Sequence, residues 1–301
     1  MLTMQFLLLC LMGVGVLTEK CRLVDNHSRS ALSNLVVNVL LPCNIIASFT
    51  GGGTRDFLAL GMVLCVSLGI IVLTYILGKF LLFRRYEEGQ KKILFYATLI
   101  SNASFLGNPM AESIYGFRAL IYASVYLLPV RIALWTVGLT IFTGAGKNPV
   151  KVIFHPCLAA TYIGIFIMVS GVTPPELLRH LVFSLGNCTT PFSMLVIGHI
   201  LAQADPRKMF TKTVLYYSFI RLVFIPLLVL GVVVLLGLDP IAAGVSVVLS
   251  GMPAPSTASI MADTYNGDRE LASRIIFVSI LCSLVTVPAL AWLLNRVLQG
   301  A

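Results

Sequence analysis

An amide-rich stretch, Ile100–Met110, lies within an apolar segment of the chain and holds the residues best suited to bind a ligand. Asn102 and Asn108 can each donate and accept hydrogen bonds, and Pro109 lacks a backbone N–H and clashes with the preceding helical turn. We therefore expect the helix to break at Pro109. Inside a membrane, freed backbone groups are tolerated only where protein or a wet cavity satisfies them. The alternative is a proline kink whose polar groups bond to a neighbouring helix.

A second stretch of this kind, Ser250–Ser256, follows in the other half of the chain and holds Pro253, Pro255 and Ser256. Two such stretches favour a binding site formed by two broken helices. Each second half-helix would begin at its proline with unpaired N–H groups, those of residues 110–112 in the first stretch, and roughly half a positive charge. Two helix starts that meet in a membrane would bind an anion, most simply a carboxylate. The amides and serine would add directional hydrogen bonds.

Membrane-spanning helices must position these stretches, because the composition is that of a membrane protein. Of 301 residues, 58% are hydrophobic and 11% are charged, against roughly 25% charged in a soluble domain. Seven cysteines form no CxxC pair, so neither a zinc site nor a disulfide framework is indicated. The sequence contains no GxxxxGK[ST], GxSxG or HExxH motif, so neither ATP-driven pumping nor an enzyme is indicated.

Windows of about 20 apolar residues predict ten transmembrane helices in an all-α fold. They run near residues 2–18, 30–49, 57–80, 91–115, 117–143, 151–170, 176–202, 212–237, 239–265 and 270–296. Five spans on each side of a turn-rich linker give the two halves opposite orientations in the membrane. We therefore expect two inverted five-helix repeats, over residues 1–143 and 151–301, joined by a short cytoplasmic linker at 144–150.

Two short patterns recur in the same order in both halves and support this repeat. N-x-x-x-P occurs at Asn38–Pro42 and Asn187–Pro191, and G-x-P occurs at Gly107–Pro109 and Gly251–Pro253. In an inverted repeat, broken helices 4 and 9 can cross at the membrane midplane. The asparagine of each N-x-x-x-P pattern would then line the same cavity. The alternative is that these asparagines hold neighbouring helices together.

The distribution of lysine and arginine predicts the orientation. Most of these residues lie in the connections after odd-numbered spans, whereas those after spans 2, 4, 6 and 8 hold Arg55, Arg118 and Arg179. The positive-inside rule places the odd connections in the cytoplasm and both termini outside. This distribution accounts for the net charge of +9 without a nucleic-acid partner. We expect a multi-pass protein of the cytoplasmic membrane.

Three ionisable residues within predicted spans are candidate partners for charge. Arg131 costs about 2.5 kcal/mol or more to insert, so it either serves as a counter-ion for a carboxylate cargo or binds Glu112 or backbone carbonyls. Arg221 either binds carbonyls or reaches the interface, with substrate contact as the alternative. Glu112 is a candidate for proton coupling, and its alternative role is a helix N-terminal acid favoured by the helix dipole.

Nearly the whole chain resembles the auxin efflux carrier family, the PIN-like transporters of plants with bacterial relatives. Asn102–Pro109 is similar to the family's N-x-x-x-x-G-x-P motif in the fourth span. Met252–Pro253 and Ala262–Tyr265 are similar to its ninth-span proline and the A-x-x-Y beyond it. Pro42 fits its second-span proline, and Arg221 fits its basic residue in the eighth span.

This resemblance implies ten helices in two inverted repeats and an elevator-like mechanism, in which a transport domain slides past a scaffold. It implies small organic anions as cargo: auxin in plants, and dicarboxylates such as malonate or malate in bacterial relatives. The family's asparagine and crossover prolines correspond to Asn102, Pro109 and Pro253. The chain lacks the long central hydrophilic loop of plant members, which indicates a compact bacterial-type member and disfavours auxin.

We therefore expect a secondary transporter of a small mono- or dicarboxylate, with coupling to H⁺ or Na⁺ and a homodimeric assembly left open. No cofactor or metal is expected. The alternative is a non-transporting membrane sensor or scaffold that binds a ligand in the same pocket. The candidate residues for substrate binding are Asn102, Asn108, Pro109, Pro253, Pro255, Ser256, Asn38 and Asn187, and those for coupling or charge are Glu112, Arg131 and Arg221.

Overall fold

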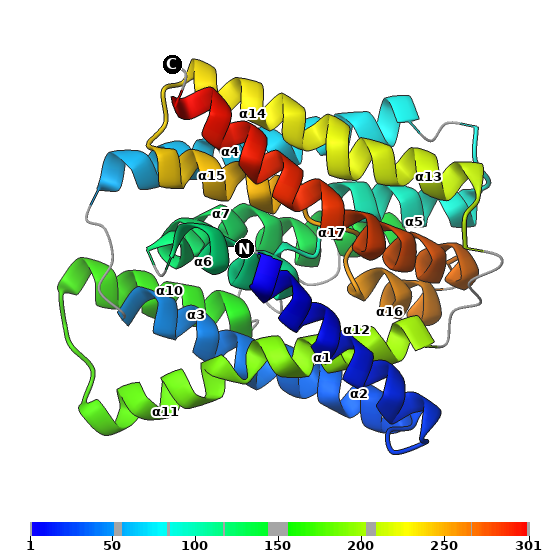
Figure 1. The fold of residues 1–301 in the computed structure, drawn as a ribbon, viewed down its shortest axis with the longest axis horizontal. Coiled ribbons are helices and arrows are strands. Elements are labelled where there is room, and N and C mark those ends of the chain that lie inside the picture. The colour runs from blue at the N-terminus through cyan, green and yellow to red at the C-terminus, as the bar shows by residue number, and fades with distance from the viewer. Residues whose placement is uncertain are drawn as a thin grey trace.

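The computed structural model describes residues 2–50, 56–82, 85–116, 118–143, 156–202, 209–265 and 267–299, which form helices and contain no strand (Figure 1). The helices of the first half are α1 (Leu2–Lys20), α2 (Asn26–Leu35), α3 (Leu41–Thr50), α4 (Phe57–Ile76), α5 (Glu88–Leu99), α6 (Asn108–Tyr115), α7 (Ala119–Ala133) and α8 (Leu139–Thr143). Those of the second half are α10 (Pro156–Ser170), α11 (Glu176–Asn187), α12 (Thr189–Ala202), α13 (Lys212–Phe219), α14 (Ile225–Leu235), α15 (Pro240–Ser250), α16 (Thr257–Thr264) and α17 (Arg269–Gln299).

Short π-helical segments join or extend several of these helices. They are η1 (Val36–Leu40), η2 (Leu77–Leu82), η3 (Ala103–Gly107), η4 (Leu134–Gly138) and η6 (Ile220–Phe224). Three of them, η1, η3 and η6, are each followed two residues later by a proline: Pro42, Pro109 and Pro226. A π-helical turn is wider than an α-helical turn, so it leaves room for the proline ring. It also moves the carbonyl to which proline cannot donate a hydrogen bond away from that ring. The helix therefore continues through each of these prolines.

Several helices are long and apolar enough to cross a membrane. Among the described residues there are five: Phe57–Phe80, Ala119–Phe142, Glu176–His199, Lys212–Leu235 and Arg269–Val297. They lie in the third, fifth, seventh, eighth and tenth predicted spans, so the chain is a multi-pass membrane protein.

The other predicted spans are shorter or interrupted in the structure. Apolar helices at Ala31–Ala47 and Pro240–Ser250 lie in spans 2 and 9. In spans 4 and 9 the helix is divided, so neither piece reaches the length of a full span. The predicted linker at 144–150 and the start of span 6 lie outside the described residues. The count of ten spans and the inverted repeat stay predictions.

Buried side chains form two hydrophobic clusters. The smaller cluster joins η1, α3 and α10 around residues such as Ile45 and Phe49, with α11 and α12 packed against it. The larger cluster contains the buried residues of α4 to α7 and α13 to α17. Figure 1 shows α2, α3, α10 and α11 below α4, α7, α14 and α15 of the larger cluster.

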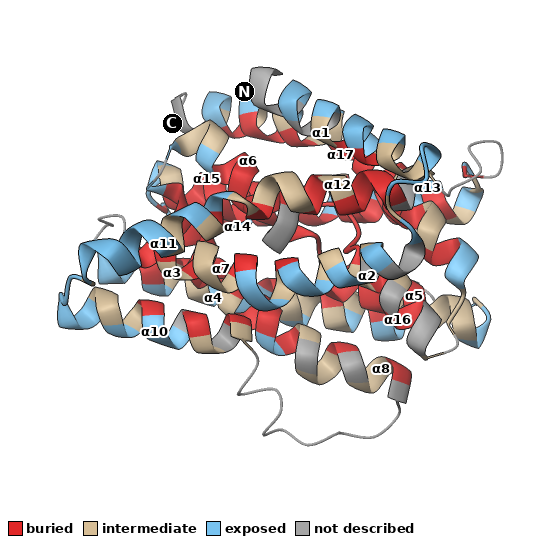
Figure 2. Ribbon diagram, turned by 90° about the horizontal axis from the view of Figure 1, so that it is seen from below, coloured by how far each residue is buried: buried red, intermediate tan, exposed pale blue. Residues whose placement is uncertain are grey.

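Helix α1 crosses α12 at close range because glycines face each other there. A Cβ on Gly15 would collide with the backbone of Leu195, and one on Gly198 would collide with the backbone of Met12. Small residues commonly allow such backbone contact between membrane helices. Figure 2 shows buried residues along the central helices and exposed residues along most of α11. Residues 99–103 and 251–256, which form the two interruptions, are all buried.

Candidate functional site

The first interruption lies between α5 and η3, and not at Pro109 as the sequence predicted. Helix α5 ends at Leu99, Ile100 is extended with φ −106° and ψ 137°, and the helix resumes at Ala103. Pro109 lies in the first turn of α6, directly after the π-helical turn that accommodates it. The N–H groups without intrahelical partners are therefore those at the start of η3, rather than those of residues 110–112.

The second interruption separates α15 from α16 and contains both predicted prolines. Residues 251–256 are all buried, and Ser256 precedes the first residue of α16 without capping it through its side chain. The Ala254 N–H donates to Ser279 Oγ of α17 at 3.0 Å. Pro253 and Pro255 cannot donate backbone hydrogen bonds, so an extended segment held by a neighbouring helix suits this sequence.

The two interruptions touch each other directly. The Asn102 N–H donates to the Pro253 carbonyl at 2.9 Å. One turn before the first interruption, the Tyr96 hydroxyl lies 2.8 Å from Thr257 Oγ1, in the first turn of α16. The starts of η3 and α16 are therefore neighbours, as the anion-site prediction requires.

The side chain of Arg221 stabilises the contact between the two interruptions. Its Nε donates to the Met252 carbonyl at 3.1 Å, and its Nη1 donates to the Thr98 carbonyl at 3.2 Å. The Tyr217 hydroxyl donates to the Ala97 carbonyl at 2.8 Å. The carbonyls at the end of α5 have lost their helical partners, and these side chains replace them. Arg221 is 2% exposed and binds backbone carbonyls, which is one of the arrangements expected from the sequence.

A cavity of about 40 Å³, lined in part by polar side chains, lies where the interruptions meet α7. It is lined by residues of the two interrupted segments and of α7 with η4: Ile100, Ser101, Asn102, Pro255, Ser256, Thr257, Val130, Arg131 and Leu134. Among these described residues there is one cation, Arg131, and no acidic side chain. Asn102 is 2% exposed, and its Nδ2 has no hydrogen-bond partner among the described residues. We call this the polar cavity.

Four of the predicted site residues line the polar cavity together: Asn102, Arg131, Pro255 and Ser256. The sequence prediction did not include Ser101, although it is a hydroxyl residue next to Asn102.

Asn108 points to another part of the fold. Its Nδ2 donates to Asn44 Oδ1 at 3.2 Å, and Asn44 Nδ2 donates to the Gly186 carbonyl at 3.5 Å. A Cβ on Gly186 would lie 3.0 Å from the Asn44 Cα, so glycine permits this close approach. These amides link α6 to α3 and α11. The sequence prediction missed Asn44, because the N-x-x-x-P pattern pointed to Asn38. Asn44 lies two residues after the proline of that pattern, Pro42.

The remaining candidates lie away from the polar cavity. Asn38 is exposed and donates to the Asn34 carbonyl of its own helix at 2.9 Å, and Asn187 is exposed at the end of α11. Glu112 is exposed on α6. The described residues that line the cavity include none of these three. Their roles in binding or coupling stay predictions.

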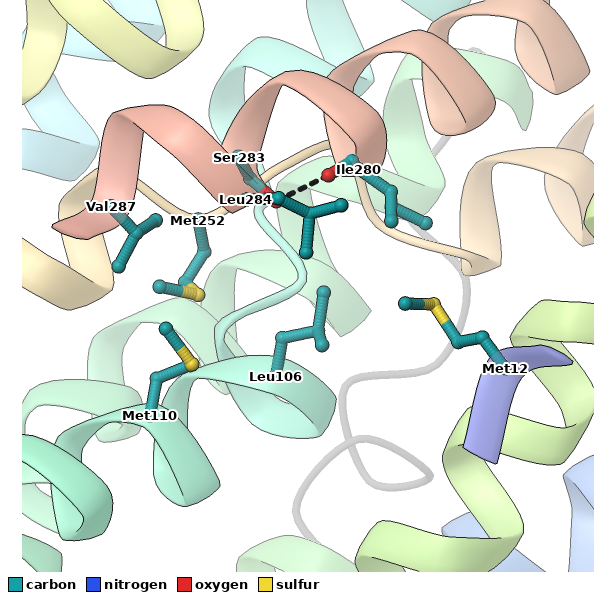
Figure 3. A pocket seen from close by; sticks show the side chains of 8 residues that line it. All are labelled: Met12, Leu106, Met110, Met252, Ile280, Ser283, Leu284 and Val287. Carbon is teal, nitrogen blue, oxygen red and sulfur yellow. Dashed lines mark hydrogen bonds between the residues drawn. The ribbon is translucent and has the colours of Figure 1, made fainter. Parts of the chain in front are cut away.

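A second, smaller cavity of about 20 Å³ lies beside the interruptions, between η3, α6, α17 and α1. Its lining is apolar apart from one serine: Met12, Leu106, Met110, Met252, Ile280, Ser283, Leu284 and Val287 (Figure 3). Ser283 Oγ donates to the Ile280 carbonyl of its own helix at 2.7 Å, so this hydroxyl is already satisfied. We call this the methionine cavity.

Comparison with known proteins gives a consistent result over nearly the whole chain. A family described as "Membrane transport protein" matches residues 2–150 and again residues 145–291. An uncharacterized transporter of Methanothermobacter thermautotrophicus is 26% identical over 289 residues, which cover 93% of this chain and 94% of that protein. A protein of Rhizobium meliloti named "Putative malonate transporter" is 24% identical over 303 residues, covering 95% and 93%.

An uncharacterized transporter of Methanocaldococcus jannaschii is 24% identical over 304 residues, covering 96% of this chain and 97% of that protein. All three names describe transporters. Because the family matches both halves of the sequence, the chain belongs to the membrane transport protein family, that of the auxin efflux (PIN-like) carriers.

Proposed function

We propose that this protein is a secondary transporter of a small organic anion, such as a mono- or dicarboxylate, which binds in the polar cavity. The observation that carries this proposal is the buried amide of Asn102, whose Nδ2 lacks a partner among the described residues. An unsatisfied buried donor costs about 1–3 kcal/mol. A carboxylate oxygen bound at this atom would recover that free energy.

The charge around the cavity also favours an anion. The starts of η3 and α16 each place roughly half a positive charge near the contact between Asn102 and Pro253. Arg131 adds a full positive charge to the same lining. Preorganised N–H groups at helix starts are common anion sites, and irregular backbone at membrane depth is common at transporter substrate sites.

A closed conformation would account for the small size of the polar cavity. A volume of about 40 Å³ has room for a few water molecules, which is less than a three-carbon dicarboxylate occupies. We infer that α7 and the interrupted segments must separate before the cargo binds. Cargo binding would thus be linked to a conformational change, as transport requires.

An elevator-like movement of two inverted repeats with crossing helices 4 and 9 suits this arrangement. The smaller hydrophobic cluster contains parts of predicted spans 2, 6 and 7, and the larger cluster contains both interrupted segments. The buried residues of the smaller cluster lie on η1, α3 and α10, and in this proposal these elements slide against the larger cluster. In this proposal the bond between Asn44 and Asn108 joins the two parts, and the gradient of the cargo, of protons or of sodium drives the cycle.

Uptake into proteoliposomes tests this proposal. Purified protein should accumulate one or more radiolabelled carboxylates from a panel that begins with malonate. Asn102→Ala should abolish both accumulation and ligand-induced thermal stabilisation, because it removes the buried donor. Asn34→Ala removes an exposed amide that is not among the candidate site residues, and it serves as the matched control. Stabilisation without accumulation would indicate a sensor, and equal uptake by Asn102→Ala would remove the polar cavity as the site.

Glu112 is the residue we propose for proton coupling. Its exposed position on α6 leaves the carboxylate accessible to protons in the present conformation. If it couples protons, Glu112→Gln should flatten the dependence of uptake on pH while leaving binding of the cargo intact. An unaltered pH profile would exclude this role.

A further inference from the structure

The two buried arginines near the interruptions have different surroundings. Arg221 donates hydrogen bonds from its Nε and one Nη to backbone carbonyls that the interruptions leave without helical partners. Arg131 is 3% exposed and lines the polar cavity with Asn102 and Ser256. Of these two arginines, Arg131 lines the cavity and Arg221 does not.

Arg131 belongs to a different element from the other polar groups of the cavity. The interrupted segments supply two helix starts, the amide of Asn102 and the hydroxyl of Ser256. Helix α7 supplies the guanidinium, which is a planar fork of donors suited to bind a carboxylate bidentately. A cargo in the cavity therefore meets positive potential from two elements, and one carboxylate engages the helix starts.

We propose that Arg131 is a specificity-determining residue that selects cargo with a second negative group over singly charged analogues. This inference rests on the proposed function, because it assumes that an anion binds in the polar cavity. A doubly charged cargo joins α7 to the interrupted segments when the cavity closes around it. A singly charged cargo of the same shape places a neutral group against the guanidinium and forgoes a charge-assisted hydrogen bond.

The expected size of this selection follows from the strength of such a bond. A hydrogen bond to a charged group contributes enough to change affinity by about 10-fold to 100-fold. A site built around a polar partner also discriminates strongly against an analogue that lacks it, because buried groups are then left poorly satisfied.

The test uses matched probes that differ in charge and hardly in shape: malonate with its monoamide, and succinate with its monoamide. Affinities are measured by thermal shift and calorimetry on the purified full-length protein at a pH where every carboxylate is ionised. The wild type should prefer the dianion of at least one pair by about 10-fold or more. Arg131→Gln should reduce that ratio to near one, mainly by weakening the dianion. Arg131→Lys should keep part of the preference, because it keeps the charge.

Arg118→Gln is the matched control, since Arg118 is exposed and lies directly before the first residue of the same helix. It should leave the ratio unchanged. If Arg131→Gln does not fold, the wild-type ratio and Arg131→Lys still decide the matter. A wild type that binds both members of each pair equally, with binding lost in Asn102→Ala, would overturn the role of Arg131 and leave the anion site intact. A wild type that binds no carboxylate probe would overturn both proposals.

Discussion

The polar cavity and the methionine cavity are built on the same two interruptions, yet only the first is lined by an amide and a guanidinium side chain. The first interruption provides Asn102 to the polar cavity and is followed, one and two helical turns later, by Leu106 and Met110 in the methionine cavity. The second interruption provides Met252 to the methionine cavity and Ser256 to the polar one. The segments that break the helices thus separate a polar from an apolar side.

This difference teaches that a helix break does not by itself make a binding site. The methionine cavity borders α1 and α17, and its flexible side chains can repack when neighbouring helices move. The polar cavity borders α7 and combines a buried amide donor with a cation. Substitutions on the polar side should therefore change affinity, and those on the apolar side should change stability alone.

The largest effect should come from Arg221, on which both cavities depend. Arg221→Met removes the donors to the buried carbonyls of Met252 and Thr98. Each unpaired carbonyl costs about 1–3 kcal/mol, so we expect a loss of several kcal/mol in unfolding free energy. Thermal unfolding in detergent checks this, with the exposed Arg118→Met as control. An unchanged melting temperature would show that these carbonyl bonds are dispensable.

Asn102→Leu should lower the affinity for the cargo without lowering the stability of the ligand-free protein. The substitution keeps a similar volume but removes a buried donor that has no partner among the described residues. We expect the affinity for the carboxylate cargo to fall by about 10-fold to 100-fold, while the stability of the ligand-free protein stays the same or rises. Calorimetric titration and thermal unfolding measure the two quantities. A matching fall in ligand-free stability would indicate a structural amide instead.

Asn44→Ala should act mainly on the movement of the two packed clusters. It removes the bonds that Asn44 makes with Asn108 and with the Gly186 carbonyl. We expect a loss of about 1–2 kcal/mol in stability and a changed transport rate with little change in equilibrium affinity. Initial uptake rates and binding constants on the same preparation check this. A loss of affinity as large as that of Asn102→Leu would place Asn44 in the binding site.

The smallest effect should come from the methionine cavity. Met110→Leu conserves volume and hydrophobicity, so the expected cost is less than about 1.5 kcal/mol. The affinity ratio between malonate and its monoamide should not change, because Met110 does not line the polar cavity. A changed ratio would show that the two cavities are not independent.

Much of the arrangement followed from the sequence because it rests on local composition. The apolar segments with few charges predicted an all-α membrane protein, and the described helices and the family confirm this. The polar residues within two of those segments predicted interruptions, and both are present. A residue's placement relative to the other half of the chain was harder to predict. The prediction of the first break at Pro109 was wrong, because the rule applied to proline ignored the π-helical turn before it.

The sequence by itself therefore determined that the helices are apolar, that two are interrupted, and which residue types lie at the interruptions. Tertiary structure alone decided which of those residues meet. Tyr217 reaches the carbonyl of Ala97 and Arg221 that of Thr98 across more than a hundred residues of chain. The physical reason is that buried donors and acceptors must be paired by whichever element packs next to them, and local sequence does not specify that neighbour.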